Sequence, residues 1–344
     1  MTRDNLKNYF KRWVMIRERP GALESAAASL FCIALCLFIW HLLTAGPPQE
    51  RIIDPFTVPS VAETFRSFPQ LWFERAVARS ALWSLGRVIG GFVLAAAIAV
   101  PLGVIAGAFL RLNSFLRPLS IFGRNVPVAA LIPLTLMWFG LGETQKVMFI
   151  FLASVAFVLF DSASAVQGVA DSYLDAAYTL GARVVPKRGA IHAALAGLVY
   201  AGVGVLACLF LAQRPGPNDA DLWEAWRTRV FVLGGVGFVI GFLLWFPIFA
   251  YQAIQKVLLA LALPEIVNSL RLLFGLAFGY IMLAEVINAN FGLGAIIITS
   301  QRQGPREHIY LSLLFIALLA FGIDRLMLTL QRWLFPYRPV GEHA

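Results

Sequence analysis

The stretch Asp171-Ser-Tyr-Leu-Asp-Ala-Ala-Tyr-Thr-Leu-Gly-Ala182 is a short polar interval between long apolar runs. In a helix, the neighbouring Ala176 and Ala177 leave a flat face of small side chains, and Gly181 is a natural place for the chain to turn. A shallow helix of this kind can lie across a membrane surface and fit into a groove on a soluble partner. Because such a pattern alone is more often an ordinary helical connector, its meaning depends on the rest of the chain.

The composition of the chain is that of a membrane protein. Of its 344 residues, 59% are hydrophobic and 14% are charged, whereas soluble domains average roughly 50% and about 25%. Backbone polar groups cannot stay unpaired in lipid, and the apolar runs are continuous rather than alternating, which excludes a membrane β-barrel. The sequence therefore predicts an all-α integral membrane protein. The net charge of +9 indicates basic cytoplasmic loops rather than a nucleic-acid partner.

Eight apolar segments are long enough to span a bilayer. They are residues 25–45, 80–110, 118–139, 147–166, 190–213, 230–251, 266–288 and 309–330. Lys and Arg are more numerous in the segments that share a side with the amino terminus, so we expect both termini in the cytoplasm. The same topology places residues 167–189, which contain the polar interval, in the cytoplasm.

Two segments outside the spans precede the central part of the chain. Residues 1–24 form a cytoplasmic amino-terminal segment, and residues 46–79 form an external segment after the first span. Within the external segment, apolar side chains recur at helical spacing and predict an amphipathic helix at the outer membrane interface. These side chains are Val61, Phe65, Phe68 and Trp72.

A second informative stretch is Asn125-Val-Pro-Val-Ala-Ala-Leu-Ile-Pro-Leu-Thr-Leu-Met-Trp-Phe-Gly-Leu-Gly-Glu143. Its two prolines, Pro127 and Pro133, bend a spanning helix and free backbone carbonyls, which is tolerated where the helix lines a cavity or packs on its neighbours. Physical reasoning alone leaves a kinked structural helix as the alternative.

As a string, this stretch resembles the permeases of nitrate, sulfonate, taurine and bicarbonate ABC importers, which are binding-protein-dependent inner-membrane components. The resemblance continues through Leu85-Gly-Arg87, Gly90-Gly-Phe92, Pro101-Leu-Gly103 with Gly107, Ala262-Leu-Pro264, Ser269-Leu-Arg271, Ala284-Glu285-Val286 and Gly292-Leu-Gly294. It implies a type I ABC importer permease fold with a MetI-like core. It also identifies the polar interval as the EAA-like loop that couples such permeases to an ATPase, with Asp175 in the place of the usual Glu.

The resemblance implies roles for two groups of residues. The ATPase-coupling group is Leu174, Asp175, Ala176, Ala177, Leu180, Gly181 and Ala182, and the translocation-pathway group is Asn125, Pro127, Pro133, Asp161 and Glu285. It further implies a second permease copy or paralogue, ATPase subunits that bind ATP and Mg, and a periplasmic or lipid-anchored solute-binding protein. The expected location is the bacterial cytoplasmic (inner) membrane, and the expected solute is small and anionic.

The chain departs from the family pattern at residues 186–250. Two extra apolar segments lie there, so we infer that a transmembrane hairpin is inserted between a first core part, 80–185, and a second core part, 251–335. Residues 336–344 then form a cytoplasmic tail.

Three interpretations of the inserted hairpin remain open. The first is a lipid-facing decoration, since surface insertions are generally tolerated. The second is a clamp on a coupling segment that the insertion splits into 171–185 and 251–258. The third is an outer contact for a binding protein, made by Leu222, Trp223 and Trp226.

Charged residues within or near the spans need partners or a wet interior. For four of them, at the inner halves or ends of their helices, pairing or snorkelling is the default. These are Asp161, Arg271, Asp324 and Arg325. Glu285 lies deeper and either lines the pathway or makes a structural hydrogen bond. An anionic solute disfavours a bare carboxylate in its path, which makes Arg87 a candidate partner for Glu285.

The sequence contains no P-loop, no His-Glu-x-x-His and no Gly-x-Ser-x-Gly motif. Its cysteines, Cys32, Cys36 and Cys208, lie in apolar runs and are interpreted as small core residues. We therefore predict no catalytic residues, no metal site and no cofactor on this chain, and ATP hydrolysis on a separate subunit. The competing hypothesis is a self-sufficient secondary transporter or channel that uses Asp161 or Glu285 as an ion-coupling site.

Overall fold

The computed structural model describes residues 21–47, 49, 51–54, 57–211, 220–288 and 291–337. Within these ranges the regular structure is helical, apart from one isolated bridge between Val184 and Tyr251. Seven helices are long and apolar enough to cross a membrane, or eight when one bent pair is counted as a single span. The predicted all-α membrane fold is therefore confirmed.

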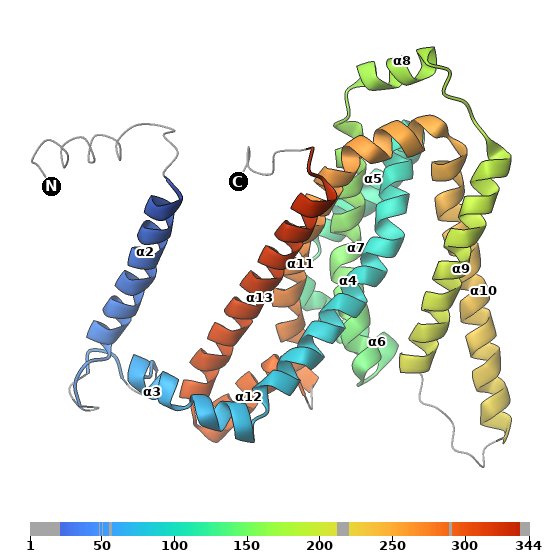
Figure 1. The fold of residues 1–344 in the computed structure, drawn as a ribbon. Helices are drawn as coiled ribbons and strands as arrows, with labels where there is room; N and C mark the ends of the chain where they lie inside the picture. Colours follow the sequence, from blue (N-terminus) through green and yellow to red (C-terminus); the bar gives the residue numbers. More distant parts are fainter. Residues whose placement is uncertain are drawn as a thin grey trace, which may run out of the picture.

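The spans follow one another with short helices at their ends (Figure 1). They are α2 (Ala22–Leu43), α4 (Val77–Ala108), the pair α5 (Leu110–Asn125) and α6 (Leu131–Phe139), α7 (Glu143–Gln167), α9 (Pro186–Leu211), α10 (Ala220–Ala250), α11 (Leu259–Asn288) and α13 (Glu307–Leu334). The short helices are α3 (Val61–Arg66), α8 (Asp171–Thr179), α12 (Leu293–Gln303), a 3-10 turn at Val128–Ala130, and π turns at Gln70–Glu74 and Ile254–Leu258.

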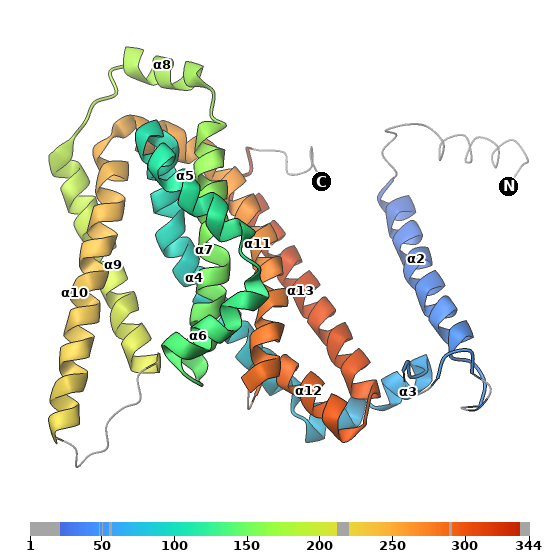
Figure 2. The same ribbon diagram turned by 180° about the vertical axis from the view of Figure 1, so that it is seen from behind.

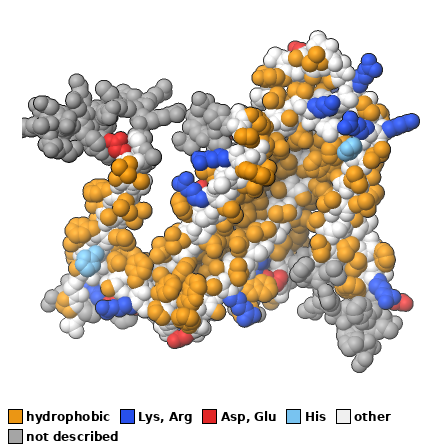
Figure 3. Space-filling view, in the orientation of Figure 1, with side chains coloured by type: hydrophobic (Ala, Val, Ile, Leu, Met, Phe, Trp, Pro, Cys, Tyr) orange, Lys and Arg blue, Asp and Glu red, His pale blue; other side chains and the backbone are white. Residues whose placement is uncertain are grey.

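The bundle has two distinct ends. At one end lie α8, the start of α2 and the end of α13, and we call this the α8 end (Figure 1). At the other, the α12 end, lie α3 and α12. Hydrophobic side chains cover most of the visible surface between the ends, and charged side chains gather toward the ends (Figure 3). This distribution is the one that a helical bundle needs in a bilayer.

The segment expected as one span bent by its prolines, 118–139, begins earlier in the structure, at Leu110. It is divided into two helices that meet at 89°. The break comes at Val126, which is extended (φ −68°, ψ 126°) because the following Pro127 disfavours a helical residue before it. Pro133 lies in the first turn of α6, where a missing N–H costs little.

Helices α4 and α7 pack unusually closely because α4 presents glycines to α7. A Cβ added at Gly91 would lie 2.5 Å from the Val147 carbonyl oxygen, and one added at Gly103 would lie 2.6 Å from Ser162 Cβ. Helix α11 packs against both helices, and Phe92 of α4 meets Phe274 of α11 edge to face at 5.3 Å. These three helices form the centre of the core.

The segment before α4 packs onto α13 near the α12 end. Phe68 and Trp72 stack at 5.6 Å, and their rings lie 5.9 and 6.1 Å from the ring of Phe315. The amphipathic stretch is thus divided between α3 and the π turn, and its aromatic side chains reach the bundle.

Two helical elements stand at the flanks of this core. The hairpin α9/α10 lies on one flank and α2 on the other (Figure 2). Cys32 and Cys36 are exposed on α2, so their interpretation as core residues is wrong. None of the α2 span is buried among the described residues. The side chain of Cys208 lies outside the described residues, as do residues 1–20, the side chains of Leu222 and Trp223, and residues 338–344.

Candidate functional site

Helix α8 lies across the α8 end of the bundle, outside the packed spans (Figure 1). Of its small residues, Ala177 is buried against the bundle, while Asp175 and Ala176 are exposed. Leu180, just after the helix, is 89% exposed. The chain turns at Gly181, which has φ +85°, a conformation that favours glycine. The result is a short helix with a free outer face.

The inner face of α8 is tied to the core. Leu174 packs against a buried cluster that includes Val166 of α7, Ile254 and Leu258 of the π turn. The N–H of Ala182 donates to the Ala177 carbonyl at 2.9 Å and closes the turn after the helix. The polar interval is thus anchored on one side and open on the other.

The two chain segments that flank the hairpin are joined directly. The Val185 N–H donates to the Ala250 carbonyl at 2.8 Å, and the Gln252 N–H donates to the Arg183 carbonyl at 3.2 Å. The Gln252 side chain also accepts from the Arg183 N–H at 3.1 Å. Residues 171–185 therefore continue into 251–258 in space, although 65 positions separate Val185 from Ala250 in sequence.

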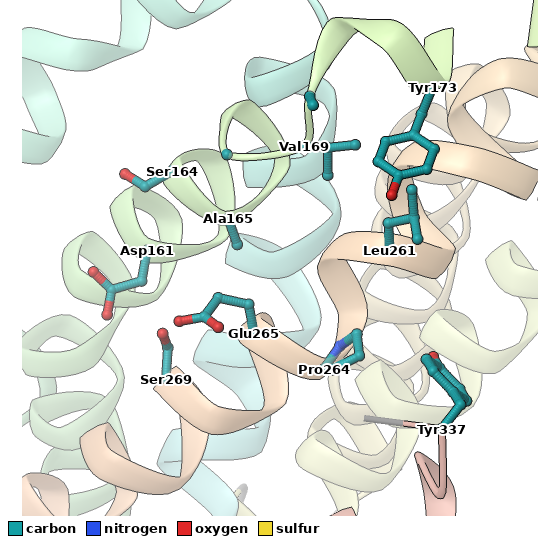
Figure 4. Close-up of a pocket in the computed structure, with 12 residues that line it drawn as sticks. Asp161, Ser164, Ala165, Val169, Tyr173, Leu261, Pro264, Glu265, Ser269 and Tyr337 are labelled. Atoms are coloured by element: carbon teal, nitrogen blue, oxygen red, sulfur yellow. The ribbon is translucent and has the colours of Figure 1, made fainter. Parts of the chain in front are cut away.

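A cavity of about 740 Å³ opens beside α8 (Figure 4). Its polar lining comes from three helices and from the segment after α13. These residues are Asp161 and Ser164 of α7, Tyr173 of α8, Glu265 and Ser269 of α11, and Tyr337. Of the five residues assigned to a pathway from sequence, Asp161 lines this cavity. The cavity brings a span-interior carboxylate next to the polar interval.

The other pathway residues lie elsewhere. Asn125 ends α5, where its Nδ2 donates to the Ile121 carbonyl at 2.8 Å, and Pro127 and Pro133 are exposed on the α5/α6 pair. None of the three lines the cavity beside α8.

Glu285 is fully buried in a network of polar contacts at the α12 end of the core. Its Oε1 lies 2.6 Å from Arg87 Nη1, and the Ser84 hydroxyl donates to the same carboxylate at 2.7 Å. The N–H of Gly294 donates to its Oε2 at 3.0 Å. The structure therefore pairs Glu285 with Arg87, one of the two alternatives that the sequence left open.

The network continues from Arg87 into α7. Arg87 Nε and Nη2 contact the two oxygens of Glu143 at 2.6 and 2.8 Å, and Lys146 Nζ lies 2.8 Å from Glu143. Arg87 Nη1 also donates to the Phe291 carbonyl at 2.7 Å. Two cations and two carboxylates balance, which lowers the cost of burying them.

Glycine makes room for the Glu285 carboxylate. A Cβ added at Gly292, which has φ +135°, would lie 2.5 Å from that carboxylate, and one at Gly294 would lie 2.7 Å from Glu285 Cβ. Both glycines were part of the family resemblance, but only the fold explains them. Sequence reasoning missed Ser84, Glu143 and Lys146, which the fold brings to the network.

Ion pairs outside this network are weaker or more exposed. Arg271 Nε lies 3.5 Å from Asp324 Oδ1, as expected for charges near span ends. In the segment between α2 and α4, Arg51 forms two bonds to Glu63 at 2.8 and 3.1 Å. The hydrogen bonds from Arg51, and next from the Ser60 N–H, lower the pKa of Glu63 to about 2.

Comparison with known proteins gives consistent matches. The family described as binding-protein-dependent transport system inner membrane component matches residues 99–185, and the match ends one residue before α9. A putative ABC transporter permease protein of Methanocaldococcus jannaschii, MJ0413, is 32% identical over 194 residues, which cover 54% of this chain and 72% of the relative.

Two further relatives align over most of the chain. The taurine transport system permease protein TauC of Escherichia coli is 23% identical and covers 95% of this chain and 92% of its own. The bicarbonate transport system permease protein CmpB of Synechococcus elongatus is 23% identical, with 87% and 85% covered. A solved structure of the MetNI methionine ABC transporter, in an inward-facing conformation, matches with a TM-score of 0.50 and 15% identity. The match covers 97% of the chain in the solved structure and 77% of the present chain, which therefore has segments beyond the shared fold.

Proposed function

The chain belongs to the family of binding-protein-dependent transport system inner membrane components, and on this basis we propose that it forms one half of the translocation pathway of an ATP-driven importer. It is a permease subunit of an ABC importer and a multi-pass membrane protein. In this proposal a second copy or a paralogue supplies the other half of the pathway, and ATP and Mg bind to separate ATPase subunits.

The proposed solute is a small anion that an external binding protein delivers. Relatives are named for taurine, aliphatic sulfonates and bicarbonate, each of which carries an anionic group. The pairing of Glu285 with Arg87 supports this choice, because a buried and neutralised carboxylate does not repel an anion.

The α8 end is proposed to face the cytoplasm, together with both termini. The excess of Lys and Arg in the segments that share a side with the amino terminus supports the orientation, since Lys and Arg favour the cytoplasmic side. Exposed basic residues at the α8 end include Arg111, Arg183, Lys187 and Arg188, although the α12 end also exposes Arg66, Arg79 and Arg302. The cytoplasmic membrane of the cell is the corresponding location.

One observation carries the coupling proposal: α8 presents a free outer face while its inner face packs on the core. The exposed Leu180 and Ala176 offer a contact to the ATPase, and Leu174 transmits a displacement to the cluster around Ile254. ATP-driven closure of the ATPase pair then moves the permease between two states to which the partners bind differently.

Site-specific cross-linking tests this contact. In a variant whose three native cysteines are Ser, Leu180→Cys places a thiol on the outer face of α8, and Leu141→Cys places one at the opposite end, where Leu141 is 76% exposed. In membranes that contain the assembled importer, we expect Leu180→Cys alone to cross-link to the ATPase. Cross-linking from Leu141→Cys alone would reverse the proposed orientation and end the proposal.

The competing hypothesis of a self-sufficient transporter keeps one supporting observation. Asp161 lines the cavity beside α8 and is available as an ion-coupling carboxylate, whereas Glu285 is already paired. Solute uptake by the purified chain alone in liposomes, without ATPase or ATP, would favour that hypothesis over the importer.

A further inference from the structure

The carbonyl of Ala97, in the middle of α4, lacks its regular helical donor. Pro101 lies inside α4 and has no N–H, so the carbonyl four residues earlier loses its helical hydrogen bond. An unpaired carbonyl is costly within a membrane. The Tyr200 hydroxyl of α9 donates to this carbonyl. A residue of the hairpin thus satisfies the group that Pro101 leaves free.

Both helices of the hairpin hold the Tyr200 side chain in place. Gly241 of α10 leaves room for the ring, since a Cβ there would lie 2.8 Å from Tyr200 Cγ. Gly237 admits the backbone beside it, with a Cβ position 2.5 Å from the Tyr200 carbonyl oxygen. Trp245 Nε1 donates to the Tyr200 hydroxyl at 3.2 Å. Contacts within the hairpin therefore fix the position of the hydroxyl that reaches α4.

A second attachment lies at the base of the hairpin. Ile248 of α10 is fully buried in a cluster with Val104 and Ile105 of α4. Directly beyond it, the Ala250 carbonyl accepts from the Val185 N–H, and Tyr251 meets Phe109 edge to face at 5.4 Å. The hairpin thus contacts α4 at two positions along its length, and at its base it is also joined to the segment after α8.

We propose that the hairpin α9/α10 is a strut between the α8 coupling segment and α4, with Tyr200 as the positioning residue that holds the carbonyl freed by Pro101. A displacement of α8 then moves the base of the hairpin, and the Tyr200 contact carries that displacement to α4 one turn before Pro101. A lipid-facing decoration needs no polar contact with α4. The inference rests on the proposed coupling role of α8.

The test is Tyr200→Phe in the full importer, reconstituted in liposomes with its ATPase and binding protein. The change removes one hydroxyl and keeps the ring among its glycines. We expect ATP hydrolysis to continue while solute transported per ATP falls by about threefold, the scale of one hydrogen bond inside a membrane. The matched control is Tyr310→Phe, which removes a hydroxyl that donates to the Thr57 carbonyl at 2.9 Å, far from the hairpin.

A second variant identifies the carbonyl as the partner. Pro101→Ala restores an N–H that can bond to the Ala97 carbonyl within α4, so Tyr200→Phe should then change the transport-to-hydrolysis ratio no further. An equal effect of Tyr200→Phe in both backgrounds, or no effect in either, overturns the strut. A wild-type complex without ATP-driven uptake instead overturns the proposed function, so the two failures are distinguishable.

Discussion

Glycines join two helix pairs in this chain, α4 with α7 and α9 with α10, yet the two pairs have different surroundings. A Cβ at Gly103 would lie 2.8 Å from the Leu159 carbonyl oxygen, and one at Gly204 would lie 2.6 Å from that of Leu233. Half of the α4 span is buried, whereas 11% of the α10 span is. Close glycine packing is therefore a property that a helix pair can have in lipid, and it does not by itself place the pair in the core.

Polar contacts distinguish the two pairs. The core pair shares a charged network in which Arg87 and Lys146 neutralise Glu143 and Glu285. The hairpin meets α4 through the neutral bond from Tyr200. A broken buried ion pair leaves an uncompensated charge. Loss of a polar contact should therefore lower the stability of the core pair more than that of the hairpin.

The largest effect is expected from the charged network. Glu285→Ala removes a fully buried carboxylate and takes away the acceptor of Ser84, of the Gly294 N–H and of one Arg87 nitrogen. Breaking a buried pair costs about 3–5 kcal/mol, so the thermal unfolding midpoint of the purified chain should fall steeply. Glu224→Ala, at an exposed position on α10, is the control. Equal midpoints for the two variants would contradict the special role of the network.

A smaller loss is expected where α4 meets α7. Gly103→Ala forces a methyl group against Ser162 and the Leu159 carbonyl, and overpacking of this kind costs roughly 1–3 kcal/mol. Gly86→Ala on the same helix adds a methyl group where nothing lies within 4 Å, so its unfolding midpoint should match or exceed that of the wild type. If both variants unfold at the same temperature, α4 and α7 are not as closely packed as described.

A more local effect is expected in the hairpin. Gly237→Ala places a methyl group 2.5 Å from the Tyr200 carbonyl oxygen, whereas Gly235→Ala meets open space. Because α10 is mostly exposed to lipid, amide hydrogen exchange should rise in α9 and α10 of Gly237→Ala while exchange in α4 stays as in the control. A matching rise in α4 would show that the hairpin and the core unfold as one unit.

Sequence reasoning predicted the existence of the spans better than their course. The length of an apolar run predicts the length of a spanning helix. The segments 80–110 and 147–166 accordingly correspond closely to α4 and α7. The run at 118–139 hides an 89° break, because apolar composition continues unchanged through the turn at Pro127. The prolines predicted a bend, but the angle of that bend depends on the helices that pack around it.

The polar contacts were partly predictable. Few charges lie within the spans, so Arg87 stood out as a partner for Glu285. Glu143 and Lys146 gave no such signal, since charges at span ends can face water and need no partner. Tyr200 lies 103 residues from Ala97, and no local pattern links a tyrosine to a particular freed carbonyl at that separation.

The smallest effect is expected from an ion pair that neither helix pair uses. The side chain of Glu63, between α2 and α4, is 38% exposed and paired with Arg51, whereas Glu285 is fully buried. Exposed pairs contribute little, so Glu63→Gln should shift the unfolding midpoint only slightly at pH 7. The measurement is the difference between wild type and variant from pH 7 to pH 2.5.

The sign of its pH dependence follows from the lowered pKa. The Arg51 hydrogen bonds, and next the Ser60 N–H, hold the pKa of Glu63 at about 2 in the folded chain, below its unfolded value of about 4.3. The stability that the Glu63 carboxylate contributes is complete above the unfolded pKa and is lost as the pH falls toward 2. The unfolding midpoints of wild type and Glu63→Gln should therefore converge in acid. A difference that stays constant across this range would mean that the carboxylate charge does not stabilise the segment. Of the two carboxylates compared, only the buried Glu285 would then stabilise the chain through its charge.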